Sequence, residues 1–210
     1  MQTTHAAVAV LSLSLGLTAH SASAQTDYPN KAIRLLVGFA PGGGSDIVAR
    51  VVAPKLSEAL NQQRIVIDNR AGASQIIASE LTAKAAPDGY TLFMASAAFT
   101  INPALYKKLP FDTLRDFSAI AIVAATPNVL LIHPSIPARS VKELIAYARA
   151  KPGQLLFGSG GVGTPSQLSG VLFNMLANTA ITHVAYKGSG AAMSDLLGGQ
   201  IQMSFPALSG

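Results

Sequence analysis

The chain has 210 residues, half of them hydrophobic, and a formal net charge of +5. This composition supplies a substantial core and excludes an intrinsically disordered protein, while the absence of cysteine excludes disulfides and thiolate metal sites. The Lys and Arg residues are scattered singly apart from Lys107 and Lys108, so no basic stripe indicates a nucleic-acid partner.

The N-terminal segment has the character of an export signal. Residues 1–24 contain no Lys, Arg, Asp or Glu, and the stretch from Ala6 to Leu17 is apolar or small apart from two serines. It is too short to span a bilayer, and Ala22-Ser23-Ala24 matches an A-x-A cleavage site. We therefore predict a signal peptide over 1–24 and a periplasmic mature protein. A leader that lies on lipid, or a misplaced start, is the alternative.

The chain after this leader opens with alternating strands and helices. We expect strands at 33–39, 65–67 and 91–94 and helices at 47–60 and 78–86. Pro54 is expected to kink its helix or to begin a new turn. This alternation predicts a parallel α/β layer with helices on its faces.

The same alternation then restarts in a second unit. We expect strands at 129–132, 155–157, 181–186 and from 200 to 205, and helices at 140–150, 166–178 and from 189 onward. The join lies near 119–128, so the predicted domains are 25–122 and 123–210. The fold class is therefore α/β with two domains.

One glycine-rich turn in each unit runs from a strand into a helix, over 38–46 and 158–167. Glycine lets the backbone approach a ligand closely, and the following helix N-terminus presents unpaired N–H groups and partial positive charge. Thr164 is expected to cap the second helix, with Gln167 completing a capping box. Each turn can bind an anion without a charged side chain. The alternative for either turn alone is a tight strand-to-helix connection of an ordinary α/β domain, which two such turns in successive units make less favoured.

Motifs for other chemistries are incomplete. Gly158, Gly160 and Gly163 match G-x-G-x-x-G, but no acidic residue follows the next strand to hold a ribose. No serine sits in G-x-S-x-G, and His133 and His183 are interpreted as packing or surface residues. No pair of His or carboxylate residues has metal-ligand spacing. An α/β enzyme is therefore the less favoured alternative to a binding protein.

Several segments occur in the order typical of one family. They are 28–35 (YPNKAIRL), 41–46 (PGGGSD), 68–73 (DNRAGA), 86–92 (APDGYTL), 101–106 (INPALY), 186–189 (YKGS) and 195–200 (DLLGGQ). Together they resemble the tripartite tricarboxylate transporter substrate receptors, the Bug-type periplasmic binding proteins. The similarity runs from Tyr28 to about Phe205.

This resemblance implies a type II periplasmic binding protein of the Venus-flytrap kind, with a ligand cleft between two α/β domains. It implies no catalysis, cofactor or metal, and a monomer that captures a small carboxylate for the subunits of a membrane transporter. Carried over by position, the ligand-binding residues are Pro41, Gly42, Gly43, Asp46, Ser96, Ala97, Ser159, Gly160, Gly163, Thr164 and Ser166. Asp46 has the alternative role of complementing the helix dipole.

The sequence departs from the family pattern in four places. Ala71 stands where the family often has Pro, and Ser74 and Gln75 replace a stretch of small residues, which is expected to reshape one cleft wall. Pro206 stands where an Asp is common. The family continues beyond Gly210, so we expect the C-terminal part of the second domain to be missing and the chain to be marginally stable. A truncated, non-functional form of such a receptor is therefore the alternative.

Overall fold

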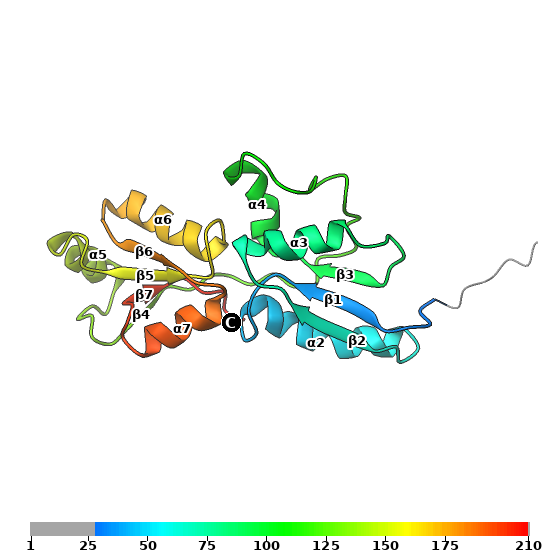
Figure 1. Cartoon of the computed structure of the whole chain (residues 1–210). Coiled ribbons are helices and arrows are strands. Elements are labelled where there is room, and N and C mark those ends of the chain that lie inside the picture. The colour runs from blue at the N-terminus through cyan, green and yellow to red at the C-terminus, as the bar shows by residue number, and fades with distance from the viewer. Residues whose placement is uncertain (1–27, 210) are drawn as a thin grey trace, which may run out of the picture.

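The computed structural model describes residues 28–209, and the predicted signal peptide lies outside them. Two lobes lie side by side, each built on one sheet (Figure 1). The first lobe contains β1 (Ile33–Val37), α2 (Gly44–Ala59), β2 (Ile65–Asn69), η1 (Ala73–Gln75), α3 (Ile76–Ala83), β3 (Thr91–Met94) and α4 (Ala97–Leu105). The second contains β4 (Leu131–Ile132), α5 (Val141–Ala150), β5 (Leu156–Ser159), α6 (Pro165–Ala177), β6 (Thr182–Ala185), α7 (Ser189–Leu197) and β7 (Met203–Ser204).

The sheet of the first lobe has the order β2-β1-β3, and all three strands are parallel. Leu35 and Val37 of the central strand are buried against Ala49 of α2 and Met94 of β3. Helix α2 covers one face, and α3 and α4 lie on the other (Figure 1). Helix α2 runs through Pro54 without interruption, so the new turn expected as one of two possibilities does not begin there. Pro54 is exposed, so water can satisfy the carbonyl that loses its partner there.

The sheet of the second lobe has the order β4-β7-β5-β6. Strand β5 is parallel to both neighbours, while β4 is antiparallel to β7. Phe157 of β5 and Leu144 of α5 belong to the main core, and α7 packs through Ala192 and Leu196 on the opposite face.

The two lobes share one strand order: β1 lies between β2 and β3, and β5 lies between β6 and β7. In each lobe the chain runs from the central strand to a neighbour on one side and then crosses to the neighbour on the other side. Ligands of open α/β sheets bind at the carboxyl end of such a central strand. These ends of β1 and β5 point toward the other lobe (Figure 1). The topology therefore directs both glycine turns to the same place.

Helix α4 was not among the predicted elements. Pro103 lies inside it, and proline disfavours helix in a sequence pattern. Among the helices of residues 28–209, none combines the length and the apolar character needed to cross a bilayer.

Candidate ligand-binding site

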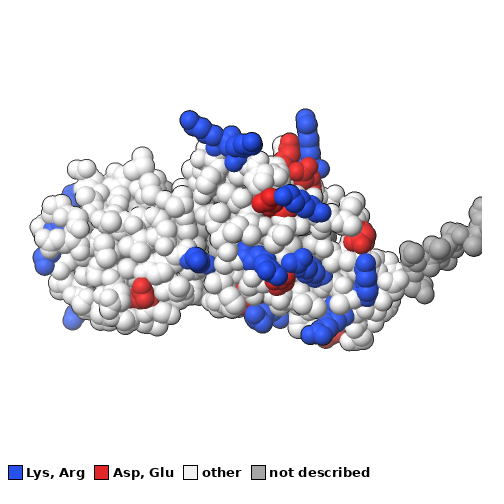
Figure 2. All heavy atoms as spheres, viewed as in Figure 1, with Lys and Arg blue, Asp and Glu red and all other residues white. Residues whose placement is uncertain are grey.

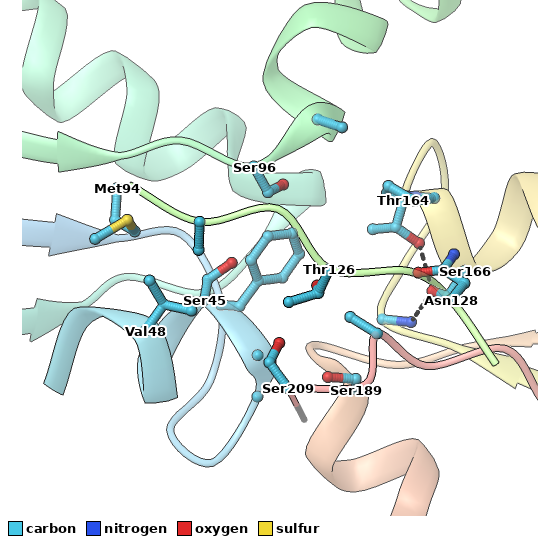
Figure 3. A pocket seen from close by; sticks show the side chains of 18 of the residues that line it. Ser45, Val48, Met94, Ser96, Thr126, Asn128, Thr164, Ser166, Ser189 and Ser209 are labelled. Carbon is cyan, nitrogen blue, oxygen red and sulfur yellow. Dashed lines mark hydrogen bonds between the residues drawn. The ribbon is translucent and has the colours of Figure 1, made fainter. Parts of the chain in front are cut away.

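A cavity of about 390 Å³ lies between the lobes (Figure 3). Both glycine turns reach it, and so do two connecting segments, 123–128 and 207–209. Val48 and Met94 supply apolar wall, while hydroxyl groups come from Ser45, Ser96, Thr126, Thr164, Ser166, Ser189 and Ser209. No Lys, Arg, His, Asp or Glu lies among its described lining residues.

Four helices begin at this cavity, two from each lobe. Its lining includes Gly44 at the start of α2, Ala97 at the start of α4, Pro165 at the start of α6 and Ser189 at the start of α7. Neither α2 nor α7 has a side-chain cap, so their first N–H groups are not satisfied in that way. The partial positive charges of the four N-termini make the cavity favourable for an anion without any cationic side chain.

The first glycine turn is held in shape by Asp46, which is 1% exposed. Its Oδ2 accepts hydrogen bonds from the Gly42 N–H (2.9 Å) and Arg50 Nε (2.8 Å), and its Oδ1 accepts from Asn69 Nδ2 (3.0 Å). Asn69 Nδ2 also donates to the Phe39 carbonyl (3.0 Å). Burial alone would raise the pKa of Asp46, but these hydrogen bonds outweigh it and hold the pKa below its ordinary value.

The second turn is held by its own hydroxyl groups. Thr164 Oγ1 donates to the Gly161 carbonyl (2.7 Å) and lies 3.0 Å from Ser166 Oγ, which accepts from the Gly160 N–H (3.2 Å). Thr164 also caps α6 by accepting from the Gln167 N–H (3.4 Å), as predicted. Gln167 does not complete the expected capping box, because its Oε1 accepts from the Gly163 N–H (2.7 Å) and not from the Thr164 N–H.

The lobes contact each other beside the cavity. The Ala40 N–H of the first turn donates to the Lys187 carbonyl (3.1 Å), and Ser74 Oγ donates to the Val162 carbonyl of the second turn. A β-carbon added to Gly43 would lie 3.3 Å from the hydroxyl oxygen of the first residue of α7. The two lobes are therefore in direct contact in this structure, and Gly43 leaves little room for a side chain.

The structure brings six of the predicted ligand-binding residues to the cavity wall: Gly43, Ser96, Ala97, Gly160, Thr164 and Ser166. The other five, Pro41, Gly42, Asp46, Ser159 and Gly163, belong to the same turns but are not among its lining residues. Ligand contact by either group stays a prediction.

Sequence reasoning missed several residues of the wall. Ser45 and Ser189 stand at helix starts, so an N-terminal serine was the available signal. Thr126, Asn128 and Ser209 come from connecting segments without a motif. Only the tertiary fold brings these last three to the cavity.

One serine and one histidine that were not predicted as a pair lie close together. Ser159 Oγ is 2.6 Å from His183 Nε2, and burial lowers the pKa of His183. Ser159 is only 1% exposed and is not among the cavity-lining residues. Within residues 28–209 no cluster of three or more potential metal ligands occurs.

Apart from the buried Asp46, the charged side chains of residues 28–209 lie mostly on the outer surface, and none of them lines the cavity. In Figure 2 most of them spread over the first lobe, with acidic and basic groups interspersed. Asp68 pairs with both Arg34 and Arg70. The positive character of the cavity therefore comes from backbone groups.

Comparison with known proteins identifies the family. Residues 48–209 match the family described as the tripartite tricarboxylate transporter family receptor. The chain belongs to this family. BugT of Bordetella pertussis is 37% identical over 197 residues, which cover 92% of this chain and 60% of BugT. The resemblance seen in the sequence is thereby confirmed, and this family consists of solute receptors and not of enzymes.

Solved structures confirm the fold of this receptor-family chain. Periplasmic binding protein BugD superposes with a TM-score of 0.83 at 30% identity, over 87% of this chain and 60% of BugD. An R. palustris protein with adipate gives 0.82 at 36% identity (86% and 60% covered). MatC from Rhodopseudomonas palustris, with bound malate, gives 0.77 at 30% identity (86% and 61% covered). The chain spans about three fifths of the length of these proteins.

Proposed function

We propose that this chain provides the ligand-capturing lobes of a periplasmic receptor for a small carboxylate. The observation that carries the proposal is the cavity between the lobes, which four helix N-termini reach and which no charged side chain lines. A carboxylate there gains hydrogen bonds and favourable helix dipoles without the desolvation cost of a buried ion pair.

The ligand class is supported by two relatives. Their structures were determined with adipate and with malate, both small dicarboxylates. Seven hydroxyl side chains line the cavity here, and such groups adapt to either end of a ligand because each can donate or accept.

Membership in the family supports the further roles. We propose that the receptor acts as a monomer, reaches the periplasm through cleavage after Ala24 and delivers its ligand to the membrane subunits of a tripartite-type transporter. We also propose 122/123 as the domain boundary, because β4, which follows it, pairs with β7 of the second lobe. N-terminal sequencing of the exported protein tests the cleavage, and an intact Met1 would contradict it.

A thermal-shift screen tests the binding proposal. The purified chain is heated with adipate, malate and a series of related mono- and dicarboxylates, with the matched uncharged amides as controls. At a concentration 100 times Kd, a bound acid stabilises by about 2.7 kcal/mol, which raises Tm by roughly 5–10 °C for a chain of this size. Stabilisation by an acid but not by its amide supports an anion site. A response to neither, or equally to both, refutes it.

A further inference from the structure

Gln75 lies behind the wall of the cavity and is completely buried, with 0% exposure. It follows two other residues with positive φ, so Ala73, Ser74 and Gln75 have φ values of 44°, 50° and 66°. This left-handed conformation is disfavoured for residues other than glycine. Such strain persists only where the surroundings enforce it, and it concentrates at functional sites.

The surroundings of Gln75 enforce one position for its side chain. A β-carbon added to Gly38 would lie 2.1 Å from Gln75 Cβ, so glycine at the end of β1 leaves the space that Gln75 fills. The side-chain amide then reaches Ser96, the N-cap of α4. Ser96 lines the cavity on the side of the first lobe (Figure 3).

The hydrogen bonds fix the orientation of this amide. The backbone N–H of Ser96 can only donate, and it lies 3.2 Å from Gln75 Oε1. The other end of the amide must therefore be Nε2, which donates to Ser96 Oγ at 2.7 Å. Nε2 also lies 3.4 Å from the Ser96 carbonyl oxygen, which can only accept and agrees with this orientation.

The same bonds fix the role of the Ser96 hydroxyl. Its oxygen accepts from Gln75 Nε2 and from the Ala98 N–H at 3.3 Å. A hydroxyl has two acceptor positions and one proton, so both acceptor positions are occupied. No hydrogen bond from this hydroxyl to another group is present within residues 28–209. Only the hydroxyl proton of Ser96 therefore remains available for a hydrogen bond to a molecule in the cavity.

The hydroxyls of the opposite turn differ. Thr164 must donate to the Gly161 carbonyl, because a carbonyl oxygen can only accept. In its contact with Ser166, the proton therefore comes from Ser166. Of these three hydroxyls, only Ser96 keeps its proton for the cavity.

We propose that Gln75 is a positioning residue that makes the Ser96 hydroxyl an obligate hydrogen-bond donor to the bound ligand. This wall then selects ligand atoms that accept hydrogen bonds, such as carboxylate oxygens, over atoms that donate them, such as amide nitrogens. The inference rests on the proposed carboxylate site and assigns specificity within it to a residue that does not itself line the cavity.

The test exchanges the donor at this position for an acceptor. In Gln75→Glu, one oxygen still accepts from the Ser96 N–H, while the other takes the hydroxyl proton and turns a lone pair of Ser96 toward the ligand. Calorimetric titration uses the acid that binds tightest among adipate, malate and the other acids of the screen. We expect Kd to rise about 10- to 100-fold, which corresponds to the loss of one hydrogen bond to a charged group.

Two further variants separate this effect from simple disruption or charge repulsion. Gln75→Met removes all hydrogen bonds of the side-chain amide to Ser96 but leaves the Ser96 proton free, so Tm falls at least as far as in Gln75→Glu while affinity falls less. Ser96→Gly removes the hydroxyl and keeps a tolerated N-cap. When Ser96→Gly is already present, Gln75→Glu should change Kd by no more than about twofold, which is the deviation typical of two substitutions that do not interact.

The outcomes distinguish the inference from the proposed function. If the unsubstituted chain binds no acid of the screen, both fail. If it binds an acid and Gln75→Met weakens binding as much as Gln75→Glu, Gln75 only supports the fold and the inference alone fails. A loss that persists in full in the Ser96→Gly background reflects the added charge, which also overturns the inference.

Discussion

Replacing Asp46 by Asn tests whether one buried carboxylate holds the first glycine turn. The asparagine keeps one oxygen, which can still accept from the Gly42 N–H and Arg50. Its NH₂ group then faces Asn69 Nδ2, which is also a donor. Asn69 cannot turn over to relieve this without losing its bond to the Phe39 carbonyl. The substitution therefore removes a charge and sets two donors against each other.

The size of the effect follows from these contacts. Hydrogen bonds to a charged group contribute about 1.5–3 kcal/mol, and Asp46 is almost fully buried. We expect Asp46→Asn to lower the free energy of unfolding by about 1.5–3 kcal/mol. Glu58→Gln is the matched control, because the Glu58 side chain is 56% exposed and pairs with the exposed Lys55. It should change stability by less than about 0.5 kcal/mol.

The acid limb of the stability curve gives a second signature. The folded-state pKa of Asp46 lies below its ordinary value, so its contribution is fully present above the unfolded pKa, about 3.9, and is lost as pH falls through the folded value. Urea unfolding, followed by far-ultraviolet circular dichroism, should show the variant and the unsubstituted chain converging below about pH 4. Equal stability at pH 7, or a constant gap at all pH values, would refute the reasoning.

Two further changes probe the lobe contact and the second lobe. Ser74→Ala removes the hydrogen bond to the Val162 carbonyl. The equilibrium between closed and open forms should shift toward the open form by up to about tenfold, which enlarges the radius of gyration measured by X-ray scattering. An unchanged radius of gyration would contradict this. Burial, with help from Asp195 at 2.6 Å, raises the pKa of Tyr186 to about 12. In Tyr186→Phe, ultraviolet titration should therefore no longer show the tyrosine that ionises last. The stability that Tyr186 contributes should disappear as pH rises from about 10 toward the folded pKa of about 12. A variant with an unchanged titration curve would exclude the assignment.

Much of the fold could be predicted from the sequence because its buried strands are continuous apolar runs between turn signals. The strands expected at 33–39, 65–67 and 91–94 correspond to β1, β2 and β3, and helix-start residues such as Ser140 and Thr164 were identified correctly. These features depend on local chemistry, which periodicity and capping patterns record.

The elements that were missed depend on tertiary contacts. Helix α4 was not predicted at all. Strands β4 and β7 fall within the strands expected at 129–132 and 200–205, but they are only two residues long and pair in antiparallel fashion, and neither the length nor the direction has a local signal. The same holds for Gln75, whose burial requires the space left by Gly38. Departure from the usual small residues marked this position in the sequence, but its hydrogen bonds to Ser96 follow only from the structure.

The division of the cavity between the lobes links ligand binding to closure. Helices α2 and α4 belong to the first lobe and α6 and α7 to the second, so an anion between them interacts with both pairs of N-termini only when the lobes are together. A ligand shifts a conformational equilibrium only by its difference in affinity for the two states. Because the N-termini are divided in this way, the proposed carboxylate ligand would lose one pair of them on opening, and its binding would favour the closed form. Under the proposed function, the same division would let a site without a cationic side chain hold its ligand with the lobes together and release it when they separate.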